Sequence, residues 1–590
     1  MNNANRSLLS VLMIAALLGA AGCSRVAKRD RHFSRAEKYF ASEQYEKAII
    51  EYRNVLRLDP TNRTALLRVA RIFFEQGSPV QAMQAMQAAD PHLESDDPAL
   101  RCRLAEFRLA TGDTVRGRNE LLDLLAQSPT NSDALRLLAG PGTPSQELTN
   151  TTVYLEQLDA KHPNSAAVLL ARAALLTRQR QLDTAEQFVQ RALQLDPNQA
   201  QAHVQMGQIH LLRTNLAAAD EAFGKAVKLA PPRSPVHTAY AQSKMVSGKP
   251  DEARALLEDV LSQAPDYLPA ALLLARLEMQ DKRLDEALAL TGRIVSKDPL
   301  NIEARQLRTE LHRAKGQPEK AALEWEQFDQ SVRPNPFIKL QVARAHLSGG
   351  DSVKAGAALD QAIIASSNRL DTVAIEARLL RARLHVEGRT PAVAVESLQR
   401  LLSITNVLEA RILLIDAQRG AGRLDEAVAT CQGLIRDHPD RPAFPLMLGM
   451  LLREQGRMAD ARNAFRRELE LSPGSLMALY QLVDLEIAAT NAPAALKTVQ
   501  TELARTNSAA LKYLEGRALA AQRLWPQAQA SLEESIGLNP QFSLAYQLLA
   551  DIHIANTNLA GAARQLEELI SKKTNDVQSM AILGTLYERM

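Results

Sequence analysis

The chain has 590 residues, of which 46% are hydrophobic and 23% are charged, and its formal net charge is +3. This length exceeds what one hydrophobic core usually supports, and the composition excludes wholesale disorder. The nearly balanced charge gives no reason to expect a nucleic-acid partner, which normally needs a concentrated basic face. Aromatic residues are only 4% of the chain, and strong helix formers such as Ala, Leu, Gln, Arg and Glu dominate. The sequence therefore predicts an all-α protein, built as several domains or as one elongated array.

The N-terminal segment has the layout of an export signal. Arg6 precedes an apolar run from Leu8 to Leu18, and small residues then lead to Cys23 in the sequence AAGC. A membrane-spanning helix needs roughly 20 apolar residues, whereas a run this short is typical of a secretory signal. We therefore expect the protein to be exported.

The ending AAGC resembles the lipobox of bacterial lipoproteins. This resemblance implies that the Cys23 thiol is lipidated, that the signal peptide of residues 1–22 is removed, and that residues 23–28 form a tether. Ser24 follows the cysteine in place of an aspartate, which by analogy with lipoprotein sorting favours the outer membrane over the inner one. The expected location is a bacterial membrane, on its periplasmic face. An ordinary cleaved signal and a short uncleaved anchor remain as alternatives.

From residue 29 onward the sequence repeats itself about every 34 residues. Each unit is predicted to form two amphipathic helices joined by a short turn, which often contains glycine, as at Gly77. The eighth position of the unit is usually Ala or Gly, and the twentieth is nearly always Ala, as at Ala48 and Ala461. Small side chains at these positions allow paired helices to approach closely. Proline is frequent at the thirty-second position, as at Pro60, where it stops the second helix.

These features resemble the tetratricopeptide repeat over about residues 29–590. The resemblance implies an all-α, right-handed superhelical solenoid of about sixteen and a half helix pairs, with the first helices lining a concave groove. The expected segments are N-terminal repeats over 29–131, a degenerate repeat over 132–165, central repeats over 166–365, an insertion at 366–374, and C-terminal repeats over 375–590.

Three departures from the repeat pattern carry expectations of their own. Gly140–Pro144 contains two glycines and two prolines, which should break the first helix of its unit. The insertion at 366–374 is expected to be a second joint. The sequence stops at Met590 after one helix of a further unit, whose apolar face favours a natural chain that continues.

The sequence contains no recognisable catalytic or metal-binding motif. It has no HExxH, CxxC or Walker sequence. Histidine recurs at the eleventh position of the unit, as at His312 and His346, which indicates packing between helices rather than a metal site. Trp325 and Trp525 fall at inward positions and are expected in the core. We therefore expect no enzyme activity, no cofactor and no metal.

The groove is the remaining candidate site. By analogy with the family, the ninth position of each unit faces it, and here that position holds both arginines and acids, which does not suit a polyphosphate strand. Lys at the fifth position and Asn at the ninth, which some relatives use to grip a peptide's C-terminal carboxylate, are absent. Aromatic and arginine side chains often anchor partners, although half-buried packing is an alternative role. The candidate groove contacts are Arg71, Arg276, Arg344, Arg383, Tyr480, Tyr513 and Arg517.

We expect a non-catalytic scaffold that binds proteins or peptides in this groove and is held to a membrane through Cys23. The GC ending, the short tether and the phrase YEKAIIEYRNVLRLDPTN resemble long tetratricopeptide lipoproteins of exosortase and exopolysaccharide systems. That resemblance implies a role in exopolysaccharide production or export, or in exosortase-linked protein sorting. The low aromatic content argues against direct polysaccharide binding. The alternative function is the recognition arm of a larger enzyme, such as a glycosyltransferase whose catalytic domain lies beyond Met590.

Overall fold

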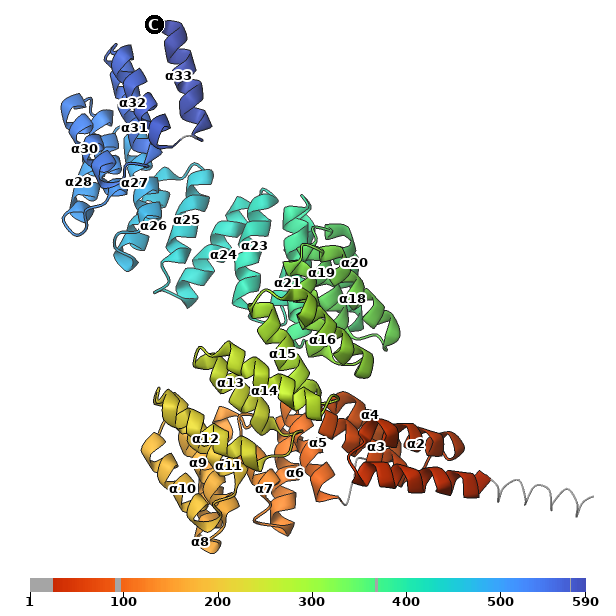
Figure 1. Cartoon of the computed structure of the whole chain (residues 1–590). Helices are drawn as coiled ribbons and strands as arrows, with labels where there is room; N and C mark the ends of the chain where they lie inside the picture. The colour runs from red at the N-terminus through yellow and green to blue at the C-terminus, as the bar shows by residue number, and fades with distance from the viewer. Residues whose placement is uncertain (1–24, 91–96, 367–369, 574) are drawn as a thin grey trace, which may run out of the picture. The chain divides into compact units, whose positions relative to one another are not determined.

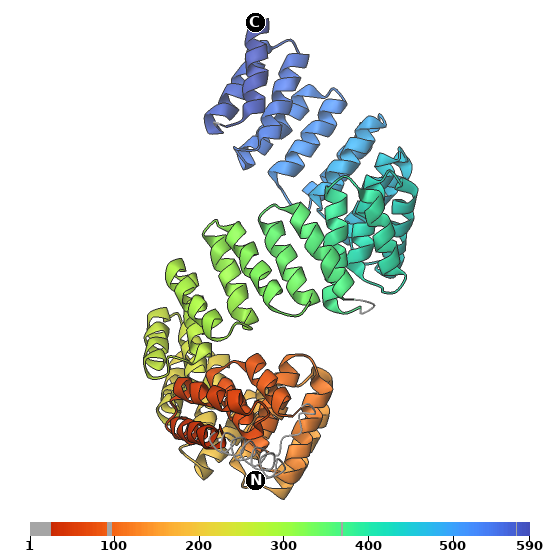
Figure 2. The ribbon, with the colours of Figure 1, turned by 90° about the vertical axis from the view of Figure 1, so that its right-hand side faces the viewer.

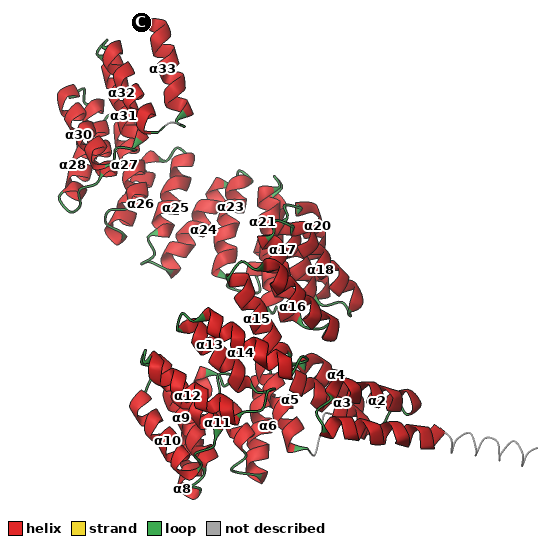
Figure 3. Ribbon diagram, in the orientation of Figure 1, coloured by secondary structure: helices red, strands yellow, loops and turns green. Residues whose placement is uncertain are grey.

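The computed structural model describes residues 25–90, 97–366, 370–573 and 575–590. Within these ranges all regular structure is helical, and Figure 3 shows only helices and loops there. The predicted all-α fold is confirmed. Cys23 and the predicted signal peptide of residues 1–22 lie outside the described residues. Residues 25–41 form one helix, so the described part of the predicted tether is helical, because its residues are good helix formers and include no Gly or Pro.

The chain forms two compact units, Met1–Gln327 and Phe328–Met590. The first unit contains, after the helix of residues 25–41, α2 (Tyr45–Leu58), α3 (Arg63–Gln76), α4 (Pro79–Ala89), α5 (Pro98–Ala110), α6 (Thr114–Gln127), α7 (Ser132–Ala139), the short 3₁₀ helix η1 (Ser145–Glu147), α8 (Leu148–Lys161), α9 (Ala166–Arg178), α10 (Leu182–Leu195), α11 (Ala200–Leu212), α12 (Leu216–Leu229), α13 (Pro235–Val246), α14 (Pro250–Gln263), α15 (Leu268–Gln280), α16 (Leu284–Lys297) and α17 (Ile302–Ala314). Helix α18 (Pro318–Ser331) includes the boundary between the units.

The second unit continues with the same alternation of helices. It contains α19 (Pro336–Ser348), α20 (Ser352–Ala365), α21 (Thr372–Glu387), α22 (Pro391–Leu402), α23 (Leu408–Gly420), α24 (Leu424–Asp437), α25 (Ala443–Glu454), α26 (Met458–Leu471), α27 (Leu476–Ala488), α28 (Ala492–Leu503), α29 (Ala509–Ala521), α30 (Trp525–Leu538), α31 (Ser543–Ala555), α32 (Leu559–Lys572) and α33 (Val577–Arg589).

Within each unit, consecutive helices mostly pack as pairs, and neighbouring pairs pack on each other, whereas α7 and α8 both pack on α9 (Figure 1). Odd-numbered helices are the first helices of the repeats and even-numbered helices are the second. The pairs α11 with α12, α19 with α20, and α29 with α30 have extensive contacts. Figure 2 shows the helices of the second unit stacked side by side in this order. This arrangement is the predicted solenoid of helix pairs, in which each repeat is stabilised mainly by its neighbours.

The small residues of the repeat lie in the seams between helices, as predicted. Ala48, Ala185 and Ala461, at the twentieth position, are 0% exposed. The eighth position is also buried in nearly every repeat, as at Ala173 and Ala343. Because only a methyl group or a hydrogen atom separates the backbones at most of these positions, the helices approach closely and their larger side chains interlock on either side.

Glycine at the eighth position makes room for the largest core side chains, which occupy the twenty-fourth. A Cβ atom on Gly449 would lie 2.5 Å from the ring of Phe465, and one on Gly207 would lie 2.7 Å from that of Phe223. Trp325 also occupies the twenty-fourth position and is 1% exposed, which confirms its predicted place in the core. Trp525, predicted in the core as well, is only partly buried against it.

Proline sets the ends of the second helices. Helices α2, α6 and α26 end at Leu58, Gln127 and Leu471, two residues before Pro60, Pro129 and Pro473. This is the expected effect of a residue that lacks an N–H donor and restricts the conformation of its predecessor.

The two irregular segments differ in form. Helix α7 ends at Ala139, directly before Gly140–Pro144, and the chain re-enters helical structure only at η1. Helix α21 begins at Thr372, inside the predicted insertion of 366–374, while residues 367–369 are not among those described.

The first unit is closed by contacts between repeats that are far apart in the sequence. The turn after α14 places Asp266, which is 4% exposed, against the end of α3, where it accepts a 2.9 Å hydrogen bond from Nε2 of Gln76. Nη2 of Arg233 lies 2.8 Å from the same carboxylate, and the Arg233 guanidinium lies over the ring of Tyr45 at 4.6 Å. A Cβ on Gly77 would lie 2.5 Å from Pro269. We call these residues the closure contact, because they join the first two repeats to the repeats around α14 and α15.

Candidate functional site

Within each unit, first helices of neighbouring repeats contact one another and so share one face of the stack. Contacts of this kind join α9 to α11, α11 to α13, α21 to α23, α27 to α29, and α29 to α31. Side chains at the ninth position of one repeat reach the second position of the next, as Arg276 does with Glu303 and Arg344 with Glu376. The second, fifth and ninth positions therefore share this surface, which we call the inner face.

The predicted arginines of the inner face have different surroundings. Arg276 and Arg344 form the inter-repeat ion pairs just described, so their charge is already neutralised within the protein. The guanidinium of Arg71 lies 5.7 Å from the centre of the Phe40 ring. Arg383 is exposed, and no hydrogen bond or ion pair joins it to another residue in the described part of the chain. Two of the four arginines thus link repeats, and Arg383 is available to a partner.

The other predicted contacts come together on α27 and α29. The rings of Tyr480 and Tyr513 lie 6.0 Å apart, and Tyr513 also packs edge-on against Phe542, with 5.6 Å between the ring centres. Arg517 forms a 2.6 Å ion pair with Asp484 beside these rings. Tyr480, Tyr513, Phe542, Asp484 and Arg517, together with Asp551 on α31, are called the tyrosine surface below.

The ionisable groups of this surface are partly removed from water. Desolvation raises the pKa of Tyr480 to about 12, and it also raises the pKa of Tyr513. Asp551 is exposed on one side, yet the protein around its carboxyl raises its pKa by desolvation. Among the described residues, no hydrogen bond or ion pair engages Asp551 or the two tyrosine hydroxyls. An uncompensated carboxylate in such surroundings gains from a nearby cation.

Sequence reasoning missed the apolar and aromatic neighbours of this surface. Phe542 precedes α31, and Met477 and Leu544 occupy the second position of their repeats, where other repeats carry Glu303 or Glu376. Met477 is 55% exposed and Leu544 is 43% exposed. Apolar residues at a position that holds an ion-pairing glutamate in two other repeats were the signal that could have identified them.

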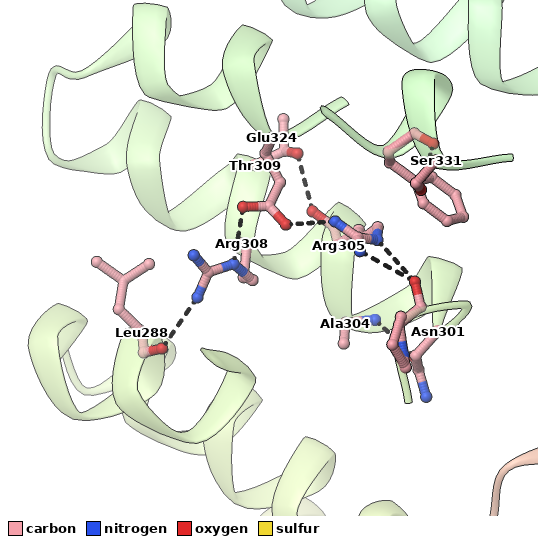
Figure 4. Close-up of polar contacts among 10 residues, drawn as sticks. Leu288, Asn301, Ala304, Arg305, Arg308, Thr309, Glu324 and Ser331 are labelled. Carbon is pink, nitrogen blue, oxygen red and sulfur yellow. Dashed lines mark hydrogen bonds and ion pairs between the residues drawn. The ribbon is translucent and has the colours of Figure 1, made fainter. Parts of the chain in front are cut away.

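In a buried polar network between α17 and α18, charged side chains pair with one another and join neighbouring helices. In Figure 4, Nη1 of Arg305 lies 2.7 Å from Glu324, and Nε of Arg308 lies 3.1 Å from the other oxygen of that carboxylate. Nη1 of Arg308 donates to the carbonyl oxygen of Leu288 at 3.3 Å. These groups join helices of adjacent repeats and have little exposed surface to offer a partner.

The histidines and a pocket between α20 and α21 do not add a reactive site. His312 and His346 are buried between helices, and no group of three or more His, Cys, Asp or Glu in the described ranges is placed to hold a metal ion. A pocket of about 450 Å³ lies between α20 and α21 and is lined by Gly356, Arg381 and His385. The guanidinium of Arg381 already donates two hydrogen bonds to the Asp360 carboxylate, at 2.8 and 3.0 Å. Nδ1 of His385 lies 2.9 Å from the Thr390 hydroxyl.

Comparison with protein families gives matches to tetratricopeptide repeats along much of the chain. A model described as tetratricopeptide repeat matches residues 33–99, 379–442, 412–476, 446–510 and 513–576. A model described as the cytochrome c-type biogenesis protein H tetratricopeptide-repeat domain matches residues 189–296. A search of curated proteins finds no match.

Solved structures match between 28% and 95% of the chain at low identity. The Cut9–Hcn1 hetero-tetramer of the APC/C is 15% identical, covers 95% of this chain and 96% of its own, and has a TM-score of 0.25. Yeast Tom70 is 15% identical and covers 73% of this chain and 96% of its own, with a TM-score of 0.33. MamA of Desulfovibrio magneticus is 18% identical and covers 28% of this chain and 95% of its own, with a TM-score of 0.24.

The helix pairs, the buried small-residue positions and the family matches together define the class of protein, an all-α scaffold of stacked repeats whose surface binds other proteins. The chain is a tetratricopeptide-repeat protein with many such motifs.

Proposed function

We propose that this scaffold is exported and lipid-anchored through Cys23, and that it holds protein partners at the periplasmic face of a bacterial membrane. The sequence AAGC at the end of an apolar run is the observation that carries the proposal. Several acyl chains on one cysteine give stable anchoring, because each buried CH₂ contributes about 0.8 kcal/mol. In the described part of the chain, no helix is long and apolar enough to cross a membrane.

The resemblance to lipoproteins of exosortase and exopolysaccharide systems supports a finer proposal. The scaffold would bring together proteins that produce or export a surface polysaccharide, or proteins that are sorted to the surface. An array of repeats suits this task, because its exposed face extends with every repeat and can contact several partners.

The test compares the wild-type protein with Cys23→Ala in a bacterial host. The wild type is expected to incorporate labelled fatty acid, to begin at Cys23 by mass spectrometry, and to sediment with membranes. Cys23→Ala should lose the label and leave the membrane fraction. A soluble wild-type protein without label would overturn the anchoring proposal, and pull-down from both strains would show which partners depend on the anchor.

A further inference from the structure

Apolar side chains lie exposed at the edge of the tyrosine surface with no evident role in the fold. In two other repeats, the second position holds a glutamate that pairs with the arginine of the preceding repeat, as Glu303 does with Arg276 and Glu376 with Arg344. At α31 this position is Leu544, and Arg517 of the preceding repeat pairs with Asp484. The second position of α31 thus carries an exposed apolar side chain, and Met477 at the second position of α27 is exposed in the same way. We call Met477 and Leu544 the apolar rim.

The charged row of the tyrosine surface has one unbalanced member. Asp484 and Arg517 neutralise each other, whereas Asp551 has no ion-pair or hydrogen-bond partner within the described ranges. Asp551 on α31 and Tyr513 on α29 lie on first helices that contact each other. The surface therefore offers a negative charge and two unbonded hydroxyls next to exposed apolar groups.

The dimensions of this region fit a short segment of protein. The second and ninth positions are separated along a helix by roughly 10 Å. Packed helices lie 8–10 Å apart, so α27 to α31 spans on the order of 20 Å, which about six extended residues cover.

We propose that the tyrosine surface and the apolar rim bind a short segment of a partner protein in which apolar side chains adjoin lysine or arginine. This inference rests on the protein-binding function and names the chemistry of the partner. The apolar side chains of the segment cover Met477 and Leu544, its cation pairs with Asp551, and its backbone bonds to the hydroxyls of Tyr480 and Tyr513. A basic segment fits better than an acidic one, because Arg517 of this surface is already paired with Asp484, whereas Asp551 has no partner among the described residues.

The packing of the rings favours a peptide over a polysaccharide. Sugars bind aromatic side chains by lying on an open ring face, but Tyr513 is only 8% exposed, because Tyr480 and Phe542 pack against it. What it can offer a ligand is its edge and its hydroxyl.

The test selects random twelve-residue peptides displayed on phage against the full chain and measures the affinity of the enriched peptides by fluorescence anisotropy. We expect enriched sequences that combine apolar residues with Lys or Arg. Asp551→Asn should weaken their binding at least roughly fivefold, and added salt should weaken it further. Asp551→Glu should restore most of the affinity, and Tyr513→Phe should lower it without loss of the ring packing.

Asp440→Asn is the matched control, because it removes an aspartate that is exposed in a turn of the same unit. The inference would be overturned if the selection enriched acidic peptides or no peptides at all. It would also be overturned if Asp551→Asn and Asp440→Asn lowered the peptide affinity equally. Binding of a purified anionic polysaccharide that is lost with Tyr480→Ala would overturn it as well. None of these outcomes changes the lipidation of Cys23, so the anchoring proposal is judged separately.

Discussion

Both units are built from the same repeat, but the contacts inside each unit join residues at different separations along the sequence. In the first unit, the closure contact joins Gln76 to Asp266, and Lys297 pairs with Glu46 at 2.7 Å across a still larger separation. In the second unit, ion pairs such as Arg344–Glu376 and Arg419–Glu454 join adjacent repeats. A repeat array needs only neighbour contacts to be stable, so the closure contact is an addition that restrains the first unit.

The largest expected effect comes from breaking the closure contact at its buried centre. Asp266→Ala leaves Arg233 and Gln76 without their shared partner, and loss of one member of a buried pair costs about 3–5 kcal/mol. We expect faster amide hydrogen exchange in 43–78 and 233–301, measured by mass spectrometry, with the second unit unchanged.

Two controls accompany this variant. Lys297→Ala removes a more exposed ion pair of the same region and should cost less than about 1 kcal/mol. Asp440→Ala, in the second unit, should change neither region. Unchanged exchange in Asp266→Ala would mean that the closure contact does not stabilise the first unit.

Substitutions in the helix seams should affect both units alike, since this packing belongs to the repeat. Gly449→Ala in the second unit and Gly207→Ala in the first place a Cβ against Phe465 and Phe223, and overpacking of this kind costs about 1–3 kcal/mol. Urea denaturation monitored by circular dichroism measures the loss. Adding Phe465→Leu to Gly449→Ala should recover part of it.

Gly537→Ala is the control for these seam variants, because nothing lies within 4 Å of the position that its Cβ would occupy. In a helix, this change should be neutral or slightly stabilising. A cost confined to one unit would show that the seams are not equivalent.

Acid should weaken the first unit through two buried histidines. Burial lowers the pKa of His237 and His312, and Nδ1 of each is buried without a partner, so a proton there has no acceptor. The folded pKa lies below the unfolded value of about 6.5, so the unfolded state binds more protons and stability falls as the pH drops through that value. His237→Gln and His312→Gln should reduce this loss of stability, measured by urea unfolding at pH about 7 and about 5.5.

In the second unit, His385 is less buried, and His385→Gln should change the pH dependence of stability less. An identical pH dependence in all variants would contradict the assignment.

Much of the fold could be predicted because the repeat encodes it locally. Ala48 and Ala461 lie in the seams where their spacing placed them, and Pro60 and Pro473 stand just beyond the ends of their helices. The candidate surface was predictable only in part. The fifth position brought Tyr480 next to Tyr513, and the ninth placed Arg517 beside them, but the rim of Met477 and Leu544 was missed.

The pairing of charged groups was decided in three dimensions. Arg276 and Arg383 occupy the same position of their repeats, yet one is bound by a glutamate of the next repeat and the other is unpaired among the described residues. Which acid lies within reach depends on how neighbouring first helices are offset, and this offset has no signature in the sequence of either repeat.

The sequence by itself determined the helices, their pairing and the inward side of each, because these follow from spacings within one repeat and from the few conformations open to proline and glycine. Only the tertiary structure decided that Asp266 meets Gln76 and Arg233, and that Asp551 remains unpaired beside two tyrosines. Small rotations between successive repeats add up along the stack, and their sum sets which distant turns touch and which charges lack a partner.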